Sequence, residues 1–330
     1  MAFESISTLV PTTYPDKNYW FIRTDGGEYY ETYLHNNFIA IGWDYLTPGD
    51  LNNINDEKEE KLRRRIAVQH KLDLSQIGDK QKATDILNKN IRFNDLKKGD
   101  VIIIPAYKSD RLTFGEVQSN SMFVNTESAH DCPYLKRRKI KWTYSEAIHR
   151  LDPIFYQVKK TRHAISDVNK FSSYIDREMG NLFFKDDFAH FILELNIEKD
   201  IQLSQLNDLT NLITEIGAKA NQHFGFNENL DDSFIKLNLQ SPGLIDIKQF
   251  GKKSLVIVAL AFAAACGPGD LNDPDAIVLP QELPVADSAD MVSFVTLNSD
   301  TIQQIRESID SLEIDKGRID SLFDYYVYGL

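Results

Sequence analysis

Along the first 200 residues, hydrophobic positions come in short alternating or uncharged runs that are separated by turn residues. These runs predict β-strands at 18–23, 38–43, 97–107, 111–119, 136–144 and 188–197. Residues 56–92 interrupt them with a highly charged stretch of helical period, which indicates a helical insertion between strands. Short strands with frequent turn signals are typical of a small, strongly curved sheet or barrel.

The pattern changes in the second half of the chain. Helical spacing predicts helices at 165–179, with Ser166 as its N-cap, at 203–223 and at 299–326. Two short strands are expected within 233–248, and the Pro-rich, acidic residues 267–290 are expected to form a loop. In the last helix a 3-4-3 spacing predicts a packing seam, either internal or against another copy, formed by Ile302, Ile305, Ile309 and Leu312.

Together these patterns predict the α+β class. The N-terminal part is a small curved sheet with a helical insertion, and a second α+β region follows with a short apolar segment and a C-terminal helix. We divide the chain into a leader at 1–17, a first domain at 18–198 and a second region at 199–330.

The stretch "KKSLVIVALAFAAACGPGD" contains thirteen uncharged residues, 254–266, and can be interpreted in three ways. At about 1.5 Å per residue they cover roughly 20 Å as a helix, short of the ~30 Å hydrocarbon core, which favours a buried helix or strand. Two lysines precede the stretch, and residues 254–330 carry three cations against thirteen acids, which is typical of a short membrane segment with positive-inside orientation. Small residues before Cys266 also resemble a bacterial lipoprotein signal, although such signals stand at the N-terminus.

Charge is distributed unevenly over the 330 residues, whose net charge is −12. Residues 1–160 carry 24 Lys and Arg against 22 Asp and Glu, whereas residues 161–330 carry 13 against 27. The acidic half is a poor nucleic-acid surface, while the first half could be one. Two cysteines without a disulfide or zinc pattern fit a reducing compartment, at least for the first half of the chain. With no secretory signal at the start, we expect a cytoplasmic protein, associated with the inner membrane if 254–266 meets lipid.

No catalytic constellation stands out, so we expect a protein that is not an enzyme and needs neither cofactor nor metal. "RTDGGEYYE" (23–31) lacks the residues of a Walker loop or a dinucleotide fingerprint, and no two histidines have metal-ligand helical spacing. A cryptic metal-dependent nuclease that uses Glu194, Asp246 or their neighbours remains an alternative.

Binding residues are easier to nominate, because all three tryptophans lie near cations or polar turns in the first half. Trp20 and Trp43 are candidates for stacking on a base, whereas the alternation around Trp142 directs its ring to the core. "LKRRKIKW" (135–142) holds five cations, which suit either phosphate contact or a solvated edge strand. The candidate phosphate contacts are Lys108, Arg138, Lys139 and Lys141.

The order of the motifs "YWFIRTDGG", "FIAIGWDYL", "KKGDVIIIPAY", "FGEVQS" and "RRKIKWTY" resembles a small domain of prokaryotic restriction and defence proteins. That domain is often joined to Mrr-type endonuclease domains and is similar to the PUA-like and EVE-like barrels that read modified or extruded bases. The resemblance covers about residues 18–195 and implies a PUA-like barrel. It also implies a ligand pocket near Trp20, Arg23, Gly26, Gly27, Gly42 and Trp43.

From this resemblance we expect a prokaryotic anti-phage sensor–effector. The first domain would bind a nucleotide second messenger or modified DNA, and the second region would signal through homo-oligomerisation, at the membrane if 254–266 reaches it. The alternative is a soluble specificity component of a restriction system that reads modified DNA, with a partner supplying cleavage.

Overall fold

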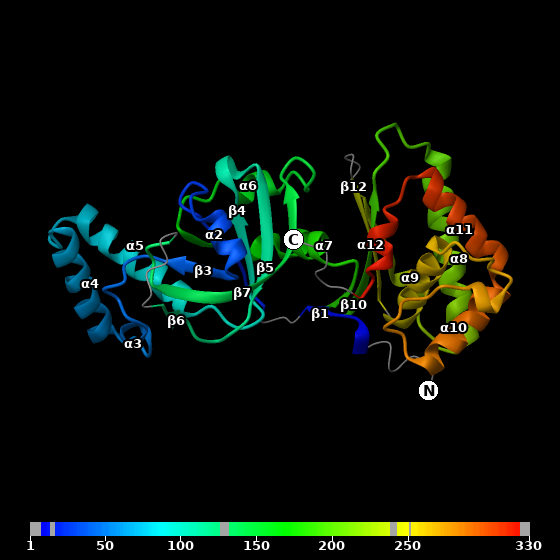
Figure 1. Cartoon of the computed structure of the whole chain (residues 1–330), viewed down its shortest axis with the longest axis horizontal. Helices are drawn as coiled ribbons and strands as arrows, with labels where there is room; N and C mark the ends of the chain where they lie inside the picture. Colours follow the sequence, from blue (N-terminus) through cyan, green and yellow to red (C-terminus); the bar gives the residue numbers. More distant parts are fainter. Residues whose placement is uncertain (1–7, 14–16, 126–131, 238–242, 251, 324–330) are drawn as a thin grey trace. The chain divides into compact units, whose positions relative to one another are not determined.

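The chain forms two compact units in a computed structural model, which describes residues 8–13, 17–125, 132–237, 243–250 and 252–323 (Figure 1). The N-terminal unit runs from Lys17 to Ser172. Of the described residues, the C-terminal unit combines 8–13 with those from Ser173 to Phe323. The sequence places the end of the first domain later, at residue 198, but the hairpin at 182–195 pairs with a strand at 243–250 and so belongs to the C-terminal unit.

A strongly curled half-barrel sheet of mixed strand direction forms the N-terminal unit. The strand order is β3-β7-β5-β4-β2-β8, and β6 pairs with β7. β2 and β4 run parallel, and the other pairs are antiparallel. The strands are β2 (Tyr19–Ile22), β3 (Phe38–Ile41), β4 (Val101–Pro105), β5 (Arg111–Val117), β6 (Phe123–Val124), β7 (Lys136–Ala147) and β8 (Ile165–Asp167).

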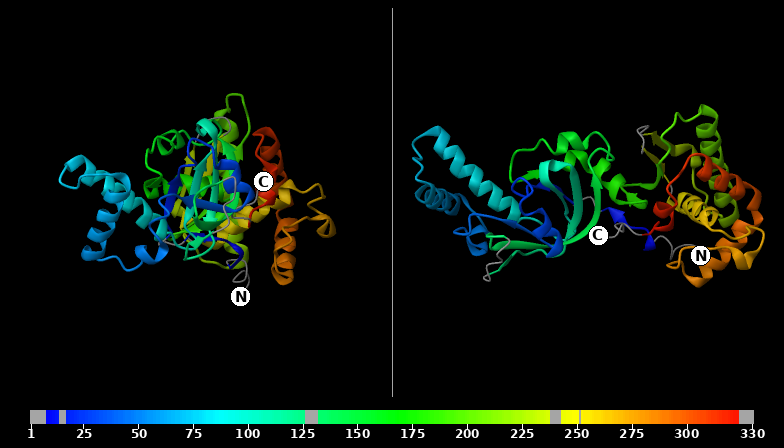
Figure 2. Two further views of the ribbon diagram at one scale, coloured as in Figure 1. Left: turned by 60° about the vertical axis from the view of Figure 1, so that its left-hand side comes forward. Right: turned by 45° about the horizontal axis from the view of Figure 1, so that its top comes forward.

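Helices of this unit include the insertion expected from the charged stretch. In both views of Figure 2 the paired helices α4 and α5 stand away from the sheet. The sides on which they face each other meet in a small apolar cluster that includes Leu62 and Ile66 of α4 and Leu87 of α5. The helices are α2 (Tyr30–His35), α3 (Pro48–Leu51), α4 (Asp56–His70), α5 (Ile77–Asn94), α6 (Phe155–Val158) and the 3₁₀ turns η1 (Tyr107–Ser109) and η2 (Asn169–Phe171).

Strand β7 is the longest strand of the half-barrel and lies inside the sheet, between β3 and β5. Its interior position corrects the interpretation of 135–142 as a solvated edge strand. Ile140 and Trp142 point into the core, as the alternation predicts, while Lys139 and Lys141 are exposed. A register shift between Phe114 and Gly115 of β5 bends the sheet at this point.

The C-terminal unit has a second sheet in the order β1-β9-β10-β12-β11, antiparallel except for β1 with β9. With the C-terminal helices it confirms the predicted α+β class. Its strands are β1 (Thr12–Thr13), β9 (Leu182–Lys185), β10 (Phe188–Leu195), β11 (Ser233–Leu237) and β12 (Gly243–Phe250). Its helices are α7 (Ser172–Met179), α8 (Leu203–Phe224), α9 (Lys252–Cys266), α10 (Val285–Leu297), α11 (Ser299–Ser311), α12 (Lys316–Asp320) and the 3₁₀ turns η3 (Leu230–Asp232) and η4 (Pro274–Ala276).

Helix α9 is the apolar stretch, and it forms the centre of the C-terminal unit. Every residue from Leu255 to Ala265 is at most 7% exposed, and the helix contacts α8, α11, α12 and β10. A helix that is apolar on all sides is stable in water only when it is buried on all sides, and α9 meets that condition. The structure therefore matches the buried-helix interpretation. No described helix has the length and apolar character needed to cross a membrane.

Charged side chains cap both ends of this central helix. Glu228 accepts bonds from the backbone N–H groups of Lys253 and Ser254, each at 2.8 Å. At the other end, Arg306 donates to the carbonyls of Ala265 and Gly267, each at 2.9 Å. An acid at the N-terminus and a cation at the C-terminus complement the helix dipole and satisfy its terminal groups.

Three segments of the chain refine or correct the predictions from sequence. Ser166 lies in strand β8 and not at a helix N-cap, since residues 165–167 pair with β2 and the helix begins only at Ser172. The expected loop at 267–290 ends at Val285, where α10 starts. The seam of α11 is internal, because its isoleucines and Leu312 are at most 1% exposed.

Candidate ligand site

A cavity of about 380 Å³ opens in the N-terminal unit where β2 and β3 end. This volume lies within the range of small-molecule pockets, about 300–1,000 Å³. The walls are mainly apolar and aromatic, with a few polar groups. They are formed by Ile22, Arg23, Asp25, Tyr33, Ala40, Ile41, Gly42, Trp43, Phe93, Tyr134, Ala164 and Ile165.

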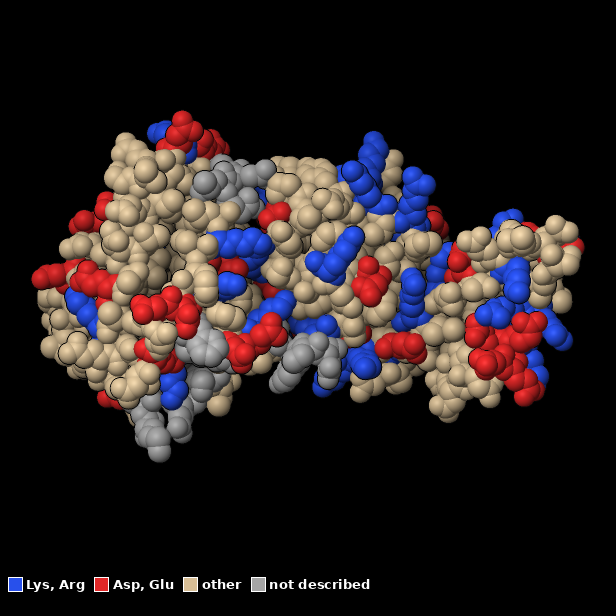
Figure 3. Space-filling model, turned by 180° about the vertical axis from the view of Figure 1, so that it is seen from behind, with Lys and Arg blue, Asp and Glu red and all other residues tan. Residues whose placement is uncertain are grey.

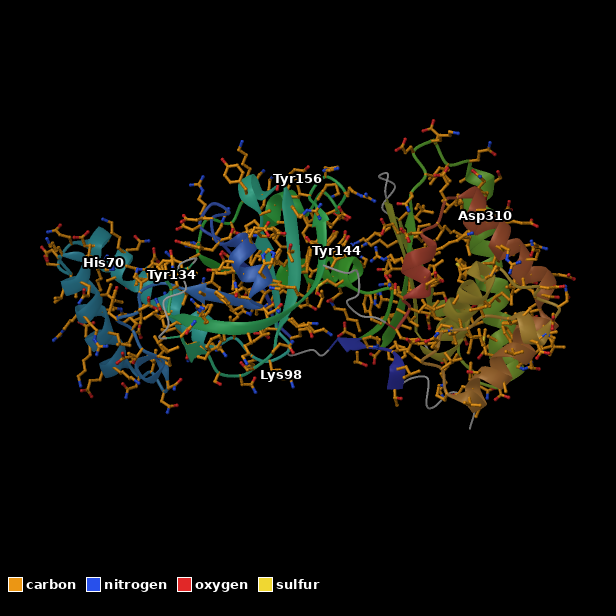
Figure 4. The ribbon with its side chains drawn as sticks, viewed as in Figure 1. His70, Lys98, Tyr134, Tyr144, Tyr156 and Asp310 are labelled. Atoms are coloured by element: carbon orange, nitrogen blue, oxygen red, sulfur yellow. The ribbon has the colours of Figure 1, made fainter. Side chains whose placement is uncertain are left out.

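Trp43 and Gly42 follow directly after β3 and form one wall. Trp43 adopts a left-handed backbone conformation (φ 58°), and Lys89 of α5 lies 5.7 Å from its ring centroid. A Cβ at Gly42 would come within 3.2 Å of the Tyr134 ring. The lack of a side chain at Gly42 thus lets the Tyr134 ring, labelled in Figure 4, close against this wall.

Polar groups in the cavity lining include those of Arg23, Asp25 and Tyr134. The Arg23 guanidinium donates to the carbonyls of Lys159 and Thr161, while its Nη1 makes no hydrogen bond in the described part of the chain. Tyr134 donates to the Asp25 carboxylate at 3.5 Å, and burial raises the pKa of this tyrosine to about 12, so it stays a donor. The site therefore offers a cation, an acceptor and a phenol to a flat ligand beside Trp43.

Behind Trp43 lies a buried lysine. Lys136, 1% exposed, donates to the Trp43 carbonyl at 2.9 Å and to the Asn90 side chain. Burial lowers the pKa of Lys136 to about 8, against the opposing effect of Asp44. A neutral amine still has two protons for these two acceptors, so the bonds survive deprotonation.

This lysine should give the stability a measurable pH dependence. Below pH 8 both the folded and the unfolded chain hold its proton; above that the folded chain loses the proton first, so stability rises with pH. We expect Lys136→Met to remove a rise of up to ~1.4 kcal/mol per pH unit between pH 8 and 9.5, measured by urea unfolding. Lys139→Met, on the exposed face of the same strand, should keep the rise, and equal slopes in both variants would contradict the assignment.

Of the predicted pocket residues, Arg23, Gly42 and Trp43 line the cavity, whereas Trp20, Gly26 and Gly27 are not among its lining residues. The Trp20 indole instead donates to Asp100 at 3.1 Å. Gly27 has φ 102°, and a Cβ there would approach the Tyr107 backbone to 2.5 Å, so this glycine is required by the turn.

The four predicted phosphate contacts lie in different surroundings. Arg138 is fully buried and donates to the carbonyls of Phe93, Asn94 and Ser119, which corrects its assignment as a phosphate contact. Lys108 is exposed beside Tyr107, away from the cavity lining. Lys139 and Lys141 are exposed and line a second, open hollow of about 490 Å³.

The carboxylates proposed for a nuclease have other partners. Glu194 accepts from Arg318 at 2.8 Å, and Asp246 bonds His190 at 2.9 Å and lies 4.0 Å from Arg177. Within the described ranges, no group of three or more His, Cys, Asp or Glu side chains is arranged to hold a metal ion.

Sequence reasoning missed Asp25, Tyr33, Phe93 and Tyr134 as cavity residues. Asp25 stands beside the nominated glycines, so the strand-to-helix turn was a usable signal. Phe93 of α5 and Tyr134 reach the cavity from distant parts of the chain, and no local pattern marks them.

Residues 20–169 match a family model described as a domain of unknown function (DUF8426). The match covers most of the N-terminal unit and less than half of the chain. No curated protein and no solved structure matches the chain.

Proposed function

We propose that the N-terminal unit is a PUA/EVE-like reader that binds the base of a nucleotide or nucleic acid in the cavity beside Trp43. The observation that carries the proposal is the cavity itself, whose lining combines aromatic residues with a cation, Arg23, and the hydrogen-bonded pair of Tyr134 and Asp25. Stacking on an aromatic ring suits every base, and Asp25, Tyr134 and Arg23 offer groups to its polar edge. The curled half-barrel is compatible with this class of reader.

In this proposal the chain is a sensor–effector of prokaryotic defence, and the C-terminal unit relays the bound state through self-association. The absence of a three-ligand metal cluster from the described residues gives the nuclease alternative no support. The C-terminal unit is also the acidic part of the chain, and Asp and Glu are prominent on its visible face in Figure 3. Its charge disfavours nucleic acid, so ligand binding is assigned to the N-terminal unit.

The experiment is to measure the binding of the four common nucleoside monophosphates to the full chain and to its Trp43→Ala variant by calorimetry. One stacked base is worth about 1–3 kcal/mol, so we expect the variant to bind roughly 5- to 150-fold more weakly. Mass spectrometry of small molecules that co-purify with the chain would identify a modified or cyclic ligand directly.

Trp20→Ala is the matched control, since Trp20 is also half-buried but does not line the cavity. It should leave affinity near the wild-type value even if it lowers stability. Equal loss in both variants, or unchanged affinity in Trp43→Ala, would place the ligand elsewhere.

A further inference from the structure

The second hollow of the N-terminal unit has the chemistry of a phosphate-binding groove. The residues that line it include Lys139 and Lys141 together with Asn36, Asn37, Gln118 and Trp142. Two residues apart on one strand, the lysines present their charges on the same face, about 7 Å apart along β7. Two exposed lysines on one face of a strand, beside an open hollow, suit the phosphates of a nucleotide.

Both lysines are free to bind an anion. Lys141 lies opposite Glu116 of β5, but that carboxylate takes the ammonium of Lys17 at 3.1 Å. Among the residues that the structure describes, no carboxylate comes within ion-pairing distance of either Lys139 or Lys141. The neighbouring cations of the same strand, from Lys136 to Arg138, are buried and engaged in structural bonds. The groove therefore concentrates the available charge of β7.

The groove and the cavity beside Trp43 share a wall. Trp142, one of the residues that line the groove, donates its indole N–H to the backbone carbonyl of Tyr33 at 2.9 Å, and Tyr33 is one of the residues that line the cavity. Asn37 of the groove and Gly42 of the cavity flank the two ends of β3, five residues apart. Five residues of extended chain cover about 17 Å, or roughly five nucleotides at the ~3.4 Å rise of a stacked strand.

We propose that the ligand of the N-terminal unit is a single-stranded nucleic acid, with one base in the cavity and the backbone of the flanking nucleotides in the groove at Lys139 and Lys141. This inference rests on the proposed function, because it specifies the ligand class of the same cavity. A mononucleotide fills only one of the two hollows, whereas a strand of about six nucleotides reaches both.

The test measures the affinity of the full chain for DNA and RNA strands of one, two, four, six and eight nucleotides by competition anisotropy. In the wild type we expect affinity to rise with length up to about six nucleotides and then to level off. Lys139→Gln/Lys141→Gln should lower the ratio of eight-nucleotide to mononucleotide affinity about tenfold. The slope of log affinity against log salt should fall in magnitude by about 1.4, or about 0.7 for each phosphate that a lysine no longer neutralises. The series that binds with higher affinity, DNA or RNA, identifies which nucleic acid the unit binds.

Lys61→Gln/Lys80→Gln is the charge-matched control, with both lysines exposed on the helical insertion. It should keep the wild-type ratio and slope. An unchanged ratio in the groove variant, or an eight-nucleotide strand that binds no tighter than a mononucleotide, overturns the inference while the proposed function stands. Loss of mononucleotide binding on Trp43→Ala, measured alongside, shows that the cavity itself is correctly assigned.

Discussion

Phe262→Ala is expected to lower the free energy of unfolding of the C-terminal unit by about 3–5 kcal/mol. Phe262 is fully buried in α9, and its ring packs edge-on against Phe191 of β10 with 5.4 Å between centroids. Because α9 is enclosed by helices on one side and the sheet on the other, the surroundings can collapse only partly into the space that the ring leaves. Urea unfolding followed by far-UV circular dichroism measures the loss.

Leu297→Ala provides the control for this experiment. Leu297 ends α10 and is 70% exposed, so its truncation should change stability by less than about 0.5 kcal/mol. If Phe262→Ala were as mild as this control, α9 would not be the centre of the core, and the arrangement of the unit would have to be revised.

Arg138→Met is expected to destabilise the N-terminal unit by about 3–5 kcal/mol. The guanidinium is fully buried and satisfies three backbone carbonyls, at Phe93, Asn94 and Ser119, which tie the end of α5 and the loop after β5 to strand β7. Methionine fills much of the volume but leaves these buried acceptors without donors, and each unsatisfied group costs about 1–3 kcal/mol. Thermal unfolding monitored by tryptophan fluorescence reports on this unit, because all three tryptophans lie in it.

The adjacent residue supplies the comparison that distinguishes a structural from a binding role. Lys139→Met removes an exposed cation of the same strand, so stability should stay within about 0.5 kcal/mol of wild type. If Arg138→Met instead left stability unchanged and weakened only oligonucleotide binding, Arg138 would be a phosphate contact after all.

Periodicity predicted most of the elements because local pattern and burial agree there. Strands at 38–41, 101–105, 111–117 and 188–195 and helices at 203–224 and 299–311 lie where hydrophobic spacing placed them. The prediction was wrong at 165–167, where three residues pair with β2: a strand so short is defined by its partner, and the sequence there also suits a helix.

The site was less predictable than the fold, and β7 shows why. Five cations in eight residues look like a charged surface, yet Lys136, Arg137 and Arg138 are buried. Their hydrogen bonds are accepted by Trp43 and Asn90, by carbonyls of the loop before β7, and by the end of α5. Whether such partners exist depends on how α5 and the loop before β7 pack, and neither can be read from the strand alone. The sequence predicted the same role for Lys139, Lys141 and Arg138. Only the structure shows that the two lysines are exposed and the arginine is buried.

If the C-terminal unit relays a bound state, as proposed, the enclosed position of α9 limits how it can do so. Withdrawing the helix would expose Leu255, Val256, Ile257, Leu260 and Phe262, which at about 1.5–3 kcal/mol each amounts to roughly 8–15 kcal/mol. That is comparable with the whole stability of an ordinary domain, so expelling α9 would be equivalent to melting the unit. A relay of this kind would have to move the folded units as rigid bodies, or bind other molecules at their outer surfaces. Helix α9 would stay buried in either case.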